Sequence, residues 1–263
     1  MKRYIETLRR ATWTYRQSLT RFPHNICATV SDLFVWRNSD EWETYFELIN
    51  MLTLFPGQEG SEDQVTLVFF DAFGQAFLDK TISITSGRRQ TVALSEIIGK
   101  DSGFFGTFAV FHAQTPTCLQ LIGSHLAERG YVSYRYRGAP LRSYVHGNID
   151  AITRLPNDRL QMLGGHSLRR REYNLQLSIV TEHYYELGIV NTTAKKHIIR
   201  VKSLTLSGEM LCVQTIKLTP RGCHLFRIAA ESAQQRIVIS SHLVMARPLV
   251  FQIWDQKMDV FHG

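Results

Sequence analysis

The sequence predicts an all-β protein built of two tandem β-sandwiches, which arose by internal duplication and follow an N-terminal amphipathic helix. Helical periodicity is confined to the first 22 residues. From residue 26 onward, short runs of β-branched and aromatic residues are separated by Gly, Pro, Asp, Asn and Ser. The same order of features then occurs twice along the chain, which is typical of a duplicated unit.

Length and composition support this class. The chain has 263 residues, of which 44% are hydrophobic, so it can bury an ordinary core and is neither disordered, collagen-like nor a disulfide scaffold. It contains no apolar run of about 18 residues and begins without the apolar centre of a secretory signal. Four scattered cysteines form no CxxC pair, which favours a reducing compartment. We therefore expect a soluble, cytoplasmic protein with no structural cofactor.

The net charge of +7 is concentrated at the N-terminus. Residues 1–25 contain six cationic side chains and one acidic one, so they carry +5 of it. The rest of the chain is nearly neutral, which argues against a nucleic-acid partner. Apolar residues at helical spacing lie on one face of this segment, before Pro23 ends the pattern: Tyr4, Leu8, Ala11, Tyr15, Leu19 and Phe22. We expect a docking helix here, with a membrane-surface anchor through residues 1–22 as the alternative.

The expected strands follow in order. In the first half they are 27–30, 45–49, 65–71, 75–84, 90–94, 106–112, 131–136 and 143–146. In the second half they are 173–180, 184–191, 197–206, 209–218, 223–228, 236–242, 250–254 and 260–262. About seven short strands in roughly 100 residues is the signature of an immunoglobulin-like sandwich, and the order resembles bacterial immunoglobulin-like modules at the level of fold alone. The predicted domains are the helix (1–25), the first sandwich (26–147), a connecting segment without strands (148–172) and the second sandwich (173–263).

The two halves match at a few positions. Gly74 falls on Gly208, and the following residues match without a gap, as in Thr81 with Thr215. Several potentially functional residues also match in this alignment: Glu47 with Glu186, Asn50 with Asn191, His112 with His242, and His146 with His262.

Common catalytic motifs are missing from the sequence. Neither GxGxxG nor GxxxxGK[ST] occurs, so a nucleotide cradle is not expected. GxSxG and HExxH are also missing, which disfavours the common serine hydrolases and zinc peptidases.

Tyrosine and arginine side chains form one candidate ligand site. Residues 131–137 alternate, which places Tyr131, Arg135 and Arg137 on one face of a strand near Tyr144. Aromatic rings stack on apolar sugar faces and arginine forks bind carboxylates, so this face suits a glycan. The first hypothesis is therefore a non-catalytic binding or assembly protein that recognises a glycan or a protein partner.

The repeated histidines support a second hypothesis. Imidazole and carboxylate groups are the ligands of many catalytic zinc and iron sites. A metal-dependent enzyme would use the set His112, His146, His242, His262, Glu47 and Glu186. Against this, a histidine before a glycine can end a strand by bonding to a backbone carbonyl. We expect at least one histidine in each half to be packed or capped in this way.

Overall fold

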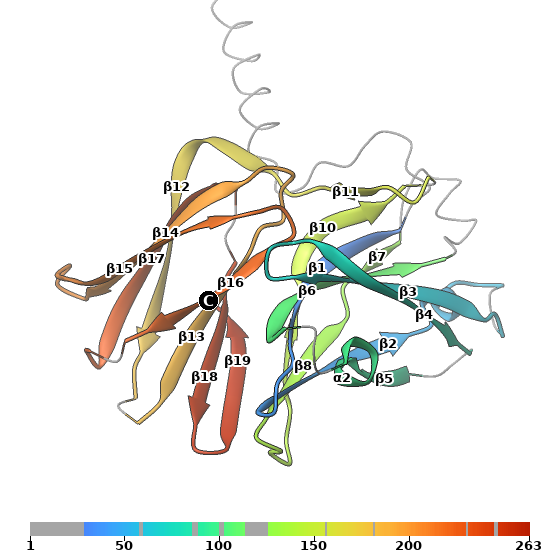
Figure 1. The fold of residues 1–263 in the computed structure, drawn as a ribbon, viewed down its shortest axis with the longest axis horizontal. Helices are drawn as coiled ribbons and strands as arrows, with labels where there is room; N and C mark the ends of the chain where they lie inside the picture. The colour runs from blue at the N-terminus through green and yellow to red at the C-terminus, as the bar shows by residue number, and fades with distance from the viewer. Residues whose placement is uncertain are drawn as a thin grey trace, which may run out of the picture.

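A computed structural model of the chain describes residues 29–57, 60–85, 89–99, 103–113, 126–155, 157–180, 182–229, 231–244 and 247–263. These residues form an all-β protein of antiparallel sheets arranged as two sandwiches side by side (Figure 1). The all-β prediction is confirmed. The predicted N-terminal helix lies outside the described residues.

In the described residues up to 162, the first half contains eleven strands, one 3-10 helix and one short α-helix. In chain order they are β1 (Val30–Arg37), β2 (Trp42–Ile49), the 3-10 helix η1 (Met51–Leu54), β3 (Asp63–Asp71), β4 (Ala76–Ile84), β5 (Arg89–Ala93), α2 (Leu94–Ile98), β6 (Phe105–His112), β7 (Ala127–Glu128), β8 (Tyr131–Tyr136), β9 (Ser143–His146), β10 (Asn148–Arg154) and β11 (Leu160–Met162). The second half consists of β12 (His166–Ser178), β13 (Tyr184–Val190), β14 (His197–Thr205), β15 (Met210–Leu218), β16 (Cys223–Ile228), β17 (Gln234–Leu243), β18 (Leu249–Trp254) and β19 (Lys257–His262).

Each half packs two sheets face to face. In the first half the sheets have the orders β11-β10-β1-β6-β3-β4 and β5-β2-β8-β9, and the short β7 pairs in parallel with β1. In the second half the orders are β12-β17-β14-β15 and β16-β13-β18-β19. The first and second strands of each half lie in different sheets, whereas in an immunoglobulin constant-type domain they are neighbours in one sheet. The immunoglobulin-like connectivity is therefore not confirmed.

Strand alternation follows the predicted pattern where one face is buried. In β8, Val132, Tyr134 and Tyr136 are buried in the core, while Tyr131 and Arg135 lie on the opposite face. The bounds of β8 and β9 coincide with the predicted ones. The first strand was predicted at 27–30 but is found at Val30–Arg37, where all eight residues are buried and no alternation marks the strand.

Residues 148–172 were expected to connect the sandwiches without strands, and this was wrong. They form β10 and β11, which extend the first large sheet beside β1, and the beginning of β12, which belongs to the second sandwich. Ala151 and Ile152 of β10 are fully buried and belong to the hydrophobic core. The segment therefore contributes strands to one sheet of each sandwich, and only a short link remains between the two halves.

The β3–β4 and β14–β15 hairpins share one register. Val65 pairs with Ile82 in the first, and Ile199 pairs with Ile216 in the second. Both registers shift near the turn, between Phe69 and Phe70 and between Ser203 and Leu204. Each turn contains a glycine with positive φ, 79° at Gly74 and 94° at Gly208.

Two asparagines also hold equivalent places. Asn50 follows β2, donates to the Ile84 carbonyl at 3.1 Å and accepts from the Leu52 amide. Asn191 follows β13, donates to the Leu218 carbonyl at 3.1 Å and accepts from the Thr193 amide. Each side chain ties the end of one sheet to the end of the other.

These registers correct two of the predicted matches. Leu67 pairs with Val110 and Val201 with Ile239, so the counterpart of His112 is Ser241 and not His242. Because adjacent strand residues face opposite sides, His242 points away from that position. Counting back from the two asparagines, Glu47 falls on Gly188 and Glu186 falls on Tyr45.

The core of the first sandwich extends into the second, which also has a core of its own. One cluster of buried side chains runs through the first half and continues into the second through residues such as Cys223 and Phe251. The β3–β4 turn contacts the turn before β16, where the Cys223 amide donates to the Ala72 carbonyl at 3.1 Å. None of the helices in the described part of the chain is long and apolar enough to cross a membrane.

Candidate ligand pocket between the sandwiches

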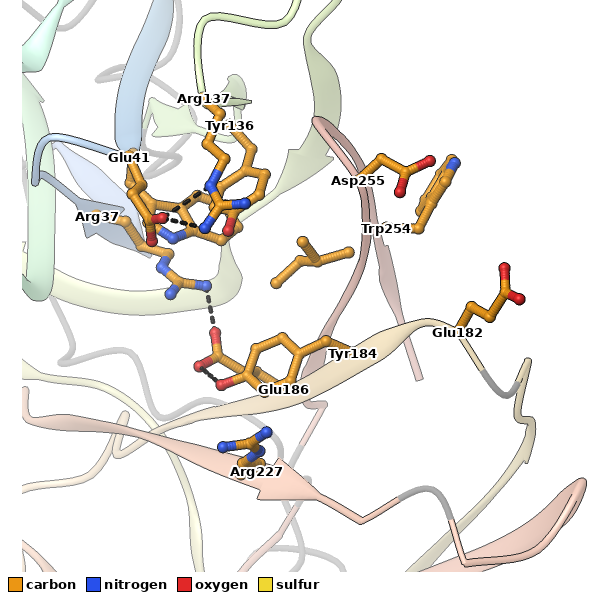
Figure 2. A pocket seen from close by; sticks show the side chains of 12 residues that line it. Arg37, Glu41, Tyr136, Arg137, Glu182, Tyr184, Glu186, Arg227, Trp254 and Asp255 are labelled. Atoms are coloured by element: carbon orange, nitrogen blue, oxygen red, sulfur yellow. Dashed lines mark hydrogen bonds and ion pairs between the residues drawn. The ribbon is translucent and has the colours of Figure 1, made fainter.

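A pocket with a cavity volume of about 410 Å³ lies between the two halves (Figure 2). In the first half, its lining comes from the end of β1, the β1–β2 turn, the start of β2, and the end of β8 with the residue that follows it. In the second half, the lining comes from β13 and the segment before it, from β16, and from the end of β18 with the turn that follows it. The lining residues are Arg37, Glu41, Trp42, Tyr136, Arg137, Glu182, Tyr184, Glu186, Arg227, Ile253, Trp254 and Asp255. None of them is a histidine, cysteine, serine or lysine, so the lining provides none of the usual nucleophiles except carboxylates and phenols.

Tight turns bring the first-half residues together. The β1–β2 turn closes with reciprocal backbone hydrogen bonds between Ser39 and Trp42. Just after β8, the Arg137 amide donates to the Glu41 carbonyl at 2.7 Å. Arg137 has a φ of 46°, in the left-handed region, and Gly138 follows it in the same region. The reversal of the chain thus directs the Arg137 side chain onto Glu41 of the neighbouring turn.

A buried ion pair links the two halves at the base of the pocket. The Nη1 atom of Arg37 lies 2.5 Å from the Oε2 atom of Glu186, and the two side chains are only 9% and 13% exposed. The guanidinium carbon of Arg37 lies 3.5 Å from the ring centroid of Trp42 and 4.9 Å from that of Phe251. Burial lowers the pKa of Arg37, and the charge of Glu186 opposes this shift.

Tyr184 completes the coordination of Glu186. Its hydroxyl donates to the Oε1 atom of Glu186 at 2.6 Å. Burial, followed by the hydrogen bond and charge of Glu186, raises the pKa of Tyr184 to about 12. The phenol therefore stays protonated at neutral pH and acts as a hydrogen-bond donor. The guanidinium of Arg227 lies over the same ring, 4.7 Å from its centroid.

The pocket contains three arginines and four carboxylates. Arg37 and Arg137 pair with Glu186 and Glu41, as the dashed lines in Figure 2 show. Glu182 and Asp255 are exposed near its rim. Taken together, the lining charges are slightly negative, and two of the three guanidinium groups are held in fixed orientations.

Aromatic rings supply the remaining walls. Trp42 packs beside Tyr136 with ring centroids 4.9 Å apart. Trp254 is half-buried and stacks on His183 at 4.9 Å, with 8° between the ring planes. The Gln252 side chain lies 2.6 Å from Nδ1 of His183, which fixes that ring behind the indole. The pocket therefore combines flat apolar rings with oriented polar groups, which suits the binding of a polar ring-shaped ligand.

Of the four residues predicted to bind a ligand, only Arg137 lines this pocket. Tyr131 and Tyr144 lie exposed on the outer face of the β5-β2-β8-β9 sheet, where the ring of Tyr131 packs against that of His146 with centroids 4.1 Å apart. Arg135 forms an ion pair with Glu43 and lines a neighbouring hollow of about 670 Å³. The predicted face exists, but its residues do not converge on one cavity.

The predicted metal ligands do not gather at one point either. The carboxylate of Glu47 accepts from Nε of Arg89 at 2.9 Å and from the Thr91 hydroxyl at 2.8 Å. Nδ1 of His146 faces the Arg129 carbonyl, Nδ1 of His242 faces the Ser167 carbonyl, and Nε2 of His262 donates to the His146 carbonyl at 3.1 Å. Within the described ranges, no group of three or more His, Cys, Asp or Glu residues could hold a metal ion.

His112 is held by two carboxylates. Its Nδ1 lies 2.5 Å from Asp63, and its Nε2 lies 2.7 Å from Glu128. Burial by itself lowers the pKa of His112, but the hydrogen bonds and charges of Asp63 and Glu128 outweigh it and raise the pKa to about 9. The imidazole is therefore a buried cation that ties β3, β6 and β7 together, with no free nitrogen for a metal.

No protein family and no curated protein matches the chain.

Proposed function

We propose that the chain is a non-catalytic binding protein, that the pocket between the sandwiches is its ligand site, and that the ligand is a neutral glycan. The observation that carries this proposal is the combination of Trp42, Tyr136, Tyr184 and Trp254 with ion-paired arginines in one cavity. Aromatic rings stack on the apolar faces of sugars, while fixed donors and acceptors bond to the hydroxyl groups.

The charge of the lining supports a neutral ligand over an acidic one. Arg37 and Arg137 are already bound by Glu186 and Glu41, so a ligand carboxylate would compete with these side chains. Glu182 and Asp255 add further negative charge at the rim. Sugar hydroxyls, in contrast, can donate to the carboxylates and accept from the guanidinium groups at the same time.

The same ion pairs support a non-catalytic role. Glycoside hydrolysis requires one carboxylic acid with a raised pKa and a second carboxylate beside it. Glu186 lies against Arg37 and accepts from Tyr184, and Glu41 lies against Arg137. Each of these two carboxylates is therefore already bound to side chains of the protein, which leaves it less available to a glycosidic oxygen.

We also propose that the two halves arose by duplication of one sandwich unit. Three observations support this origin: the common order of β1-β6-β3-β4 and β12-β17-β14-β15, the shared hairpin register, and the equivalent bonds of Asn50 and Asn191. The unpaired thiols of Cys212 and Cys223 support a cytoplasmic location.

The proposal is tested by screening the full chain against neutral and acidic oligosaccharides and by measuring the best binder by calorimetry. Trp254→Ala and Arg227→Gln should each weaken binding about tenfold or more. Tyr131→Ala should change it less than twofold, because Tyr131 lies on the outer sheet face. Thermal unfolding verifies that each variant folds.

Three results would reject the proposal. A preference for acidic glycans would contradict the charge argument. A loss of binding in the Tyr131 variant alone would move the site to the outer face. A screen without any glycan binder, together with capture of a protein ligand that depends on Trp254, would make the partner a protein.

A further inference from the structure

The outer face of the β12-β17-β14-β15 sheet gathers cationic side chains. Inward positions such as Ile199, Val201 and Ile239 form the core of this sandwich. The alternate positions face outward and include four cations, which we call the basic face: Arg200, Lys202, Lys217 and Arg236. Glu172 on β12 is the one acidic residue among the outward positions of the paired strand segments.

The sheet register brings these cations close together. Arg200 and Lys202 are successive outward residues of β14. Lys217 lies opposite Ile198 on one side of β14, and Arg236 lies opposite Leu204 on the other. Neighbouring strands are about 5 Å apart and successive outward residues about 7 Å, so the charges occupy one continuous surface. Among the described residues, none of the four forms an ion pair with a carboxylate.

The sandwich itself does not require these cations. The matching hairpin registers place Arg200 on Thr66, Lys202 on Val68 and Lys217 on Ser83 of the first half. The same structural positions thus tolerate small neutral residues. Clustered like charges destabilise a folded domain slightly, so their presence on one sheet points to an anionic partner.

We propose that the basic face docks on the surface of an anionic lipid bilayer. Aliphatic side chains lie within and beside it, as expected for a surface that enters the headgroup region. Ile198 and Val213 are exposed between the cations, and Leu206 and Met210, near the β14–β15 turn, are 53% and 48% exposed. Single-stranded nucleic acids are usually bound by aromatic rings on which bases stack, and no aromatic residue occupies an outward position of the paired segments.

Docking through this face leaves the pocket open. The pocket is lined by β13, β16 and β18 of the opposite sheet, which also provides the main contacts with the first half (Figure 1). The cytoplasmic leaflet carries anionic lipids, and each cation near such a surface strengthens binding about fivefold. The membrane proposal does not depend on the identity of the pocket ligand.

Vesicle co-sedimentation of the full chain tests this proposal. We expect binding to phosphatidylcholine vesicles that contain 30% phosphatidylserine, little binding to phosphatidylcholine alone, and release at high salt. Arg200→Thr with Lys217→Ser introduces the residues found at the matching first-half positions, and it should weaken binding roughly 25-fold. The control Lys80→Ser with Lys257→Ser removes the same charge from exposed positions elsewhere, and it should change binding less than threefold.

A second pair of substitutions separates lipid from other polyanions. Leu206→Ser with Met210→Ser should weaken vesicle binding while leaving any binding to heparin or RNA unchanged. Equal binding of the Arg200/Lys217 variant and the wild type would overturn the proposal, as would loss of binding on deletion of residues 1–22 alone. Tight binding to RNA without binding to vesicles would identify a nucleic-acid surface instead.

Discussion

The ion pair between Arg37 and Glu186 is predicted to be the strongest polar link between the two sandwiches. Replacing Arg37 with Met leaves the carboxylate of Glu186 buried, with the Tyr184 hydroxyl as its remaining donor. Replacing Glu186 with Gln leaves the guanidinium of Arg37 buried without a counter-charge. Because removal of one partner from a buried pair typically costs about 3 to 5 kcal/mol, each single variant should lower the free energy of unfolding by that amount.

The double variant distinguishes a buried pair from a solvated one. Arg37→Met with Glu186→Gln removes both charges, so it should lose much less stability than the sum of the single variants. Urea denaturation at pH 7 measures all four proteins, and the slopes of the transitions report whether the halves still unfold together. Single-variant losses below about 1 kcal/mol, in the range of exposed pairs, would refute the interpretation.

Three further predictions concern stability. His112 has a folded-state pKa of about 9 against an ordinary value of 6.5, so its contribution to the free energy of unfolding is complete below pH 6.5 and is lost as the pH rises through 9. The Tm measured from pH 6 to pH 10 should therefore fall in the wild type and change less in His112→Gln. Equal pH dependence in the two proteins would contradict a charged imidazole. Burial raises the pKa of Asp32 from 3.8 to about 7, so ionisation of this carboxyl lowers the stability of the fold as the pH rises from 3.8 to 7. Asp32→Asn should therefore be more stable than the wild type at pH 8 and lose this advantage near pH 5. A variant that is less stable than the wild type at pH 8 would contradict this expectation. Gly74→Ala should lower the free energy of unfolding by about 2 to 4 kcal/mol, because the new methyl group would lie 2.0 Å from the Pro220 carbonyl oxygen. Gly208→Ala should lower it by only about 1 to 2 kcal/mol, because Gly208 has a positive φ but open space around it. Equal losses in urea denaturation would show that the β3–β4 turn does not pack tightly against the turn at Pro220.

The predicted strands were most accurate where one face of a sheet is buried and the other is exposed. β8 shows this alternation and was located with its observed bounds. β1 lies between other strands with both faces covered, so its sequence has no alternation to mark it. β10 and β11 were missed because the basic run at 169–171 and the Gly164-Gly165 pair suggested a loop, although these residues lie after both strands.

The pocket could not be located from the sequence because it depends on long-range packing. Arg37 and Glu186 belong to different sandwiches, and nothing near either residue indicates that they meet. The aromatic content and the arginines near Tyr136 indicated the chemistry of a ligand site but placed it on the outer sheet face. The histidine hypothesis depended on an alignment that was displaced by one residue at His112, and one residue is enough to turn a strand side chain to the other face.

The most direct test of the pocket as the ligand site is a titration of the 15N-labelled tryptophan indole signals with the glycan selected by the screen. Trp42 and Trp254 line the pocket, whereas the indole of Trp36 is buried and donates to the Phe70 and Thr107 carbonyls. We predict that the Trp254 signal shifts with the same Kd as calorimetry reports, and that the Trp36 signal stays in place. Saturating glycan that leaves the Trp42 and Trp254 signals unchanged would contradict a ligand site between the sandwiches.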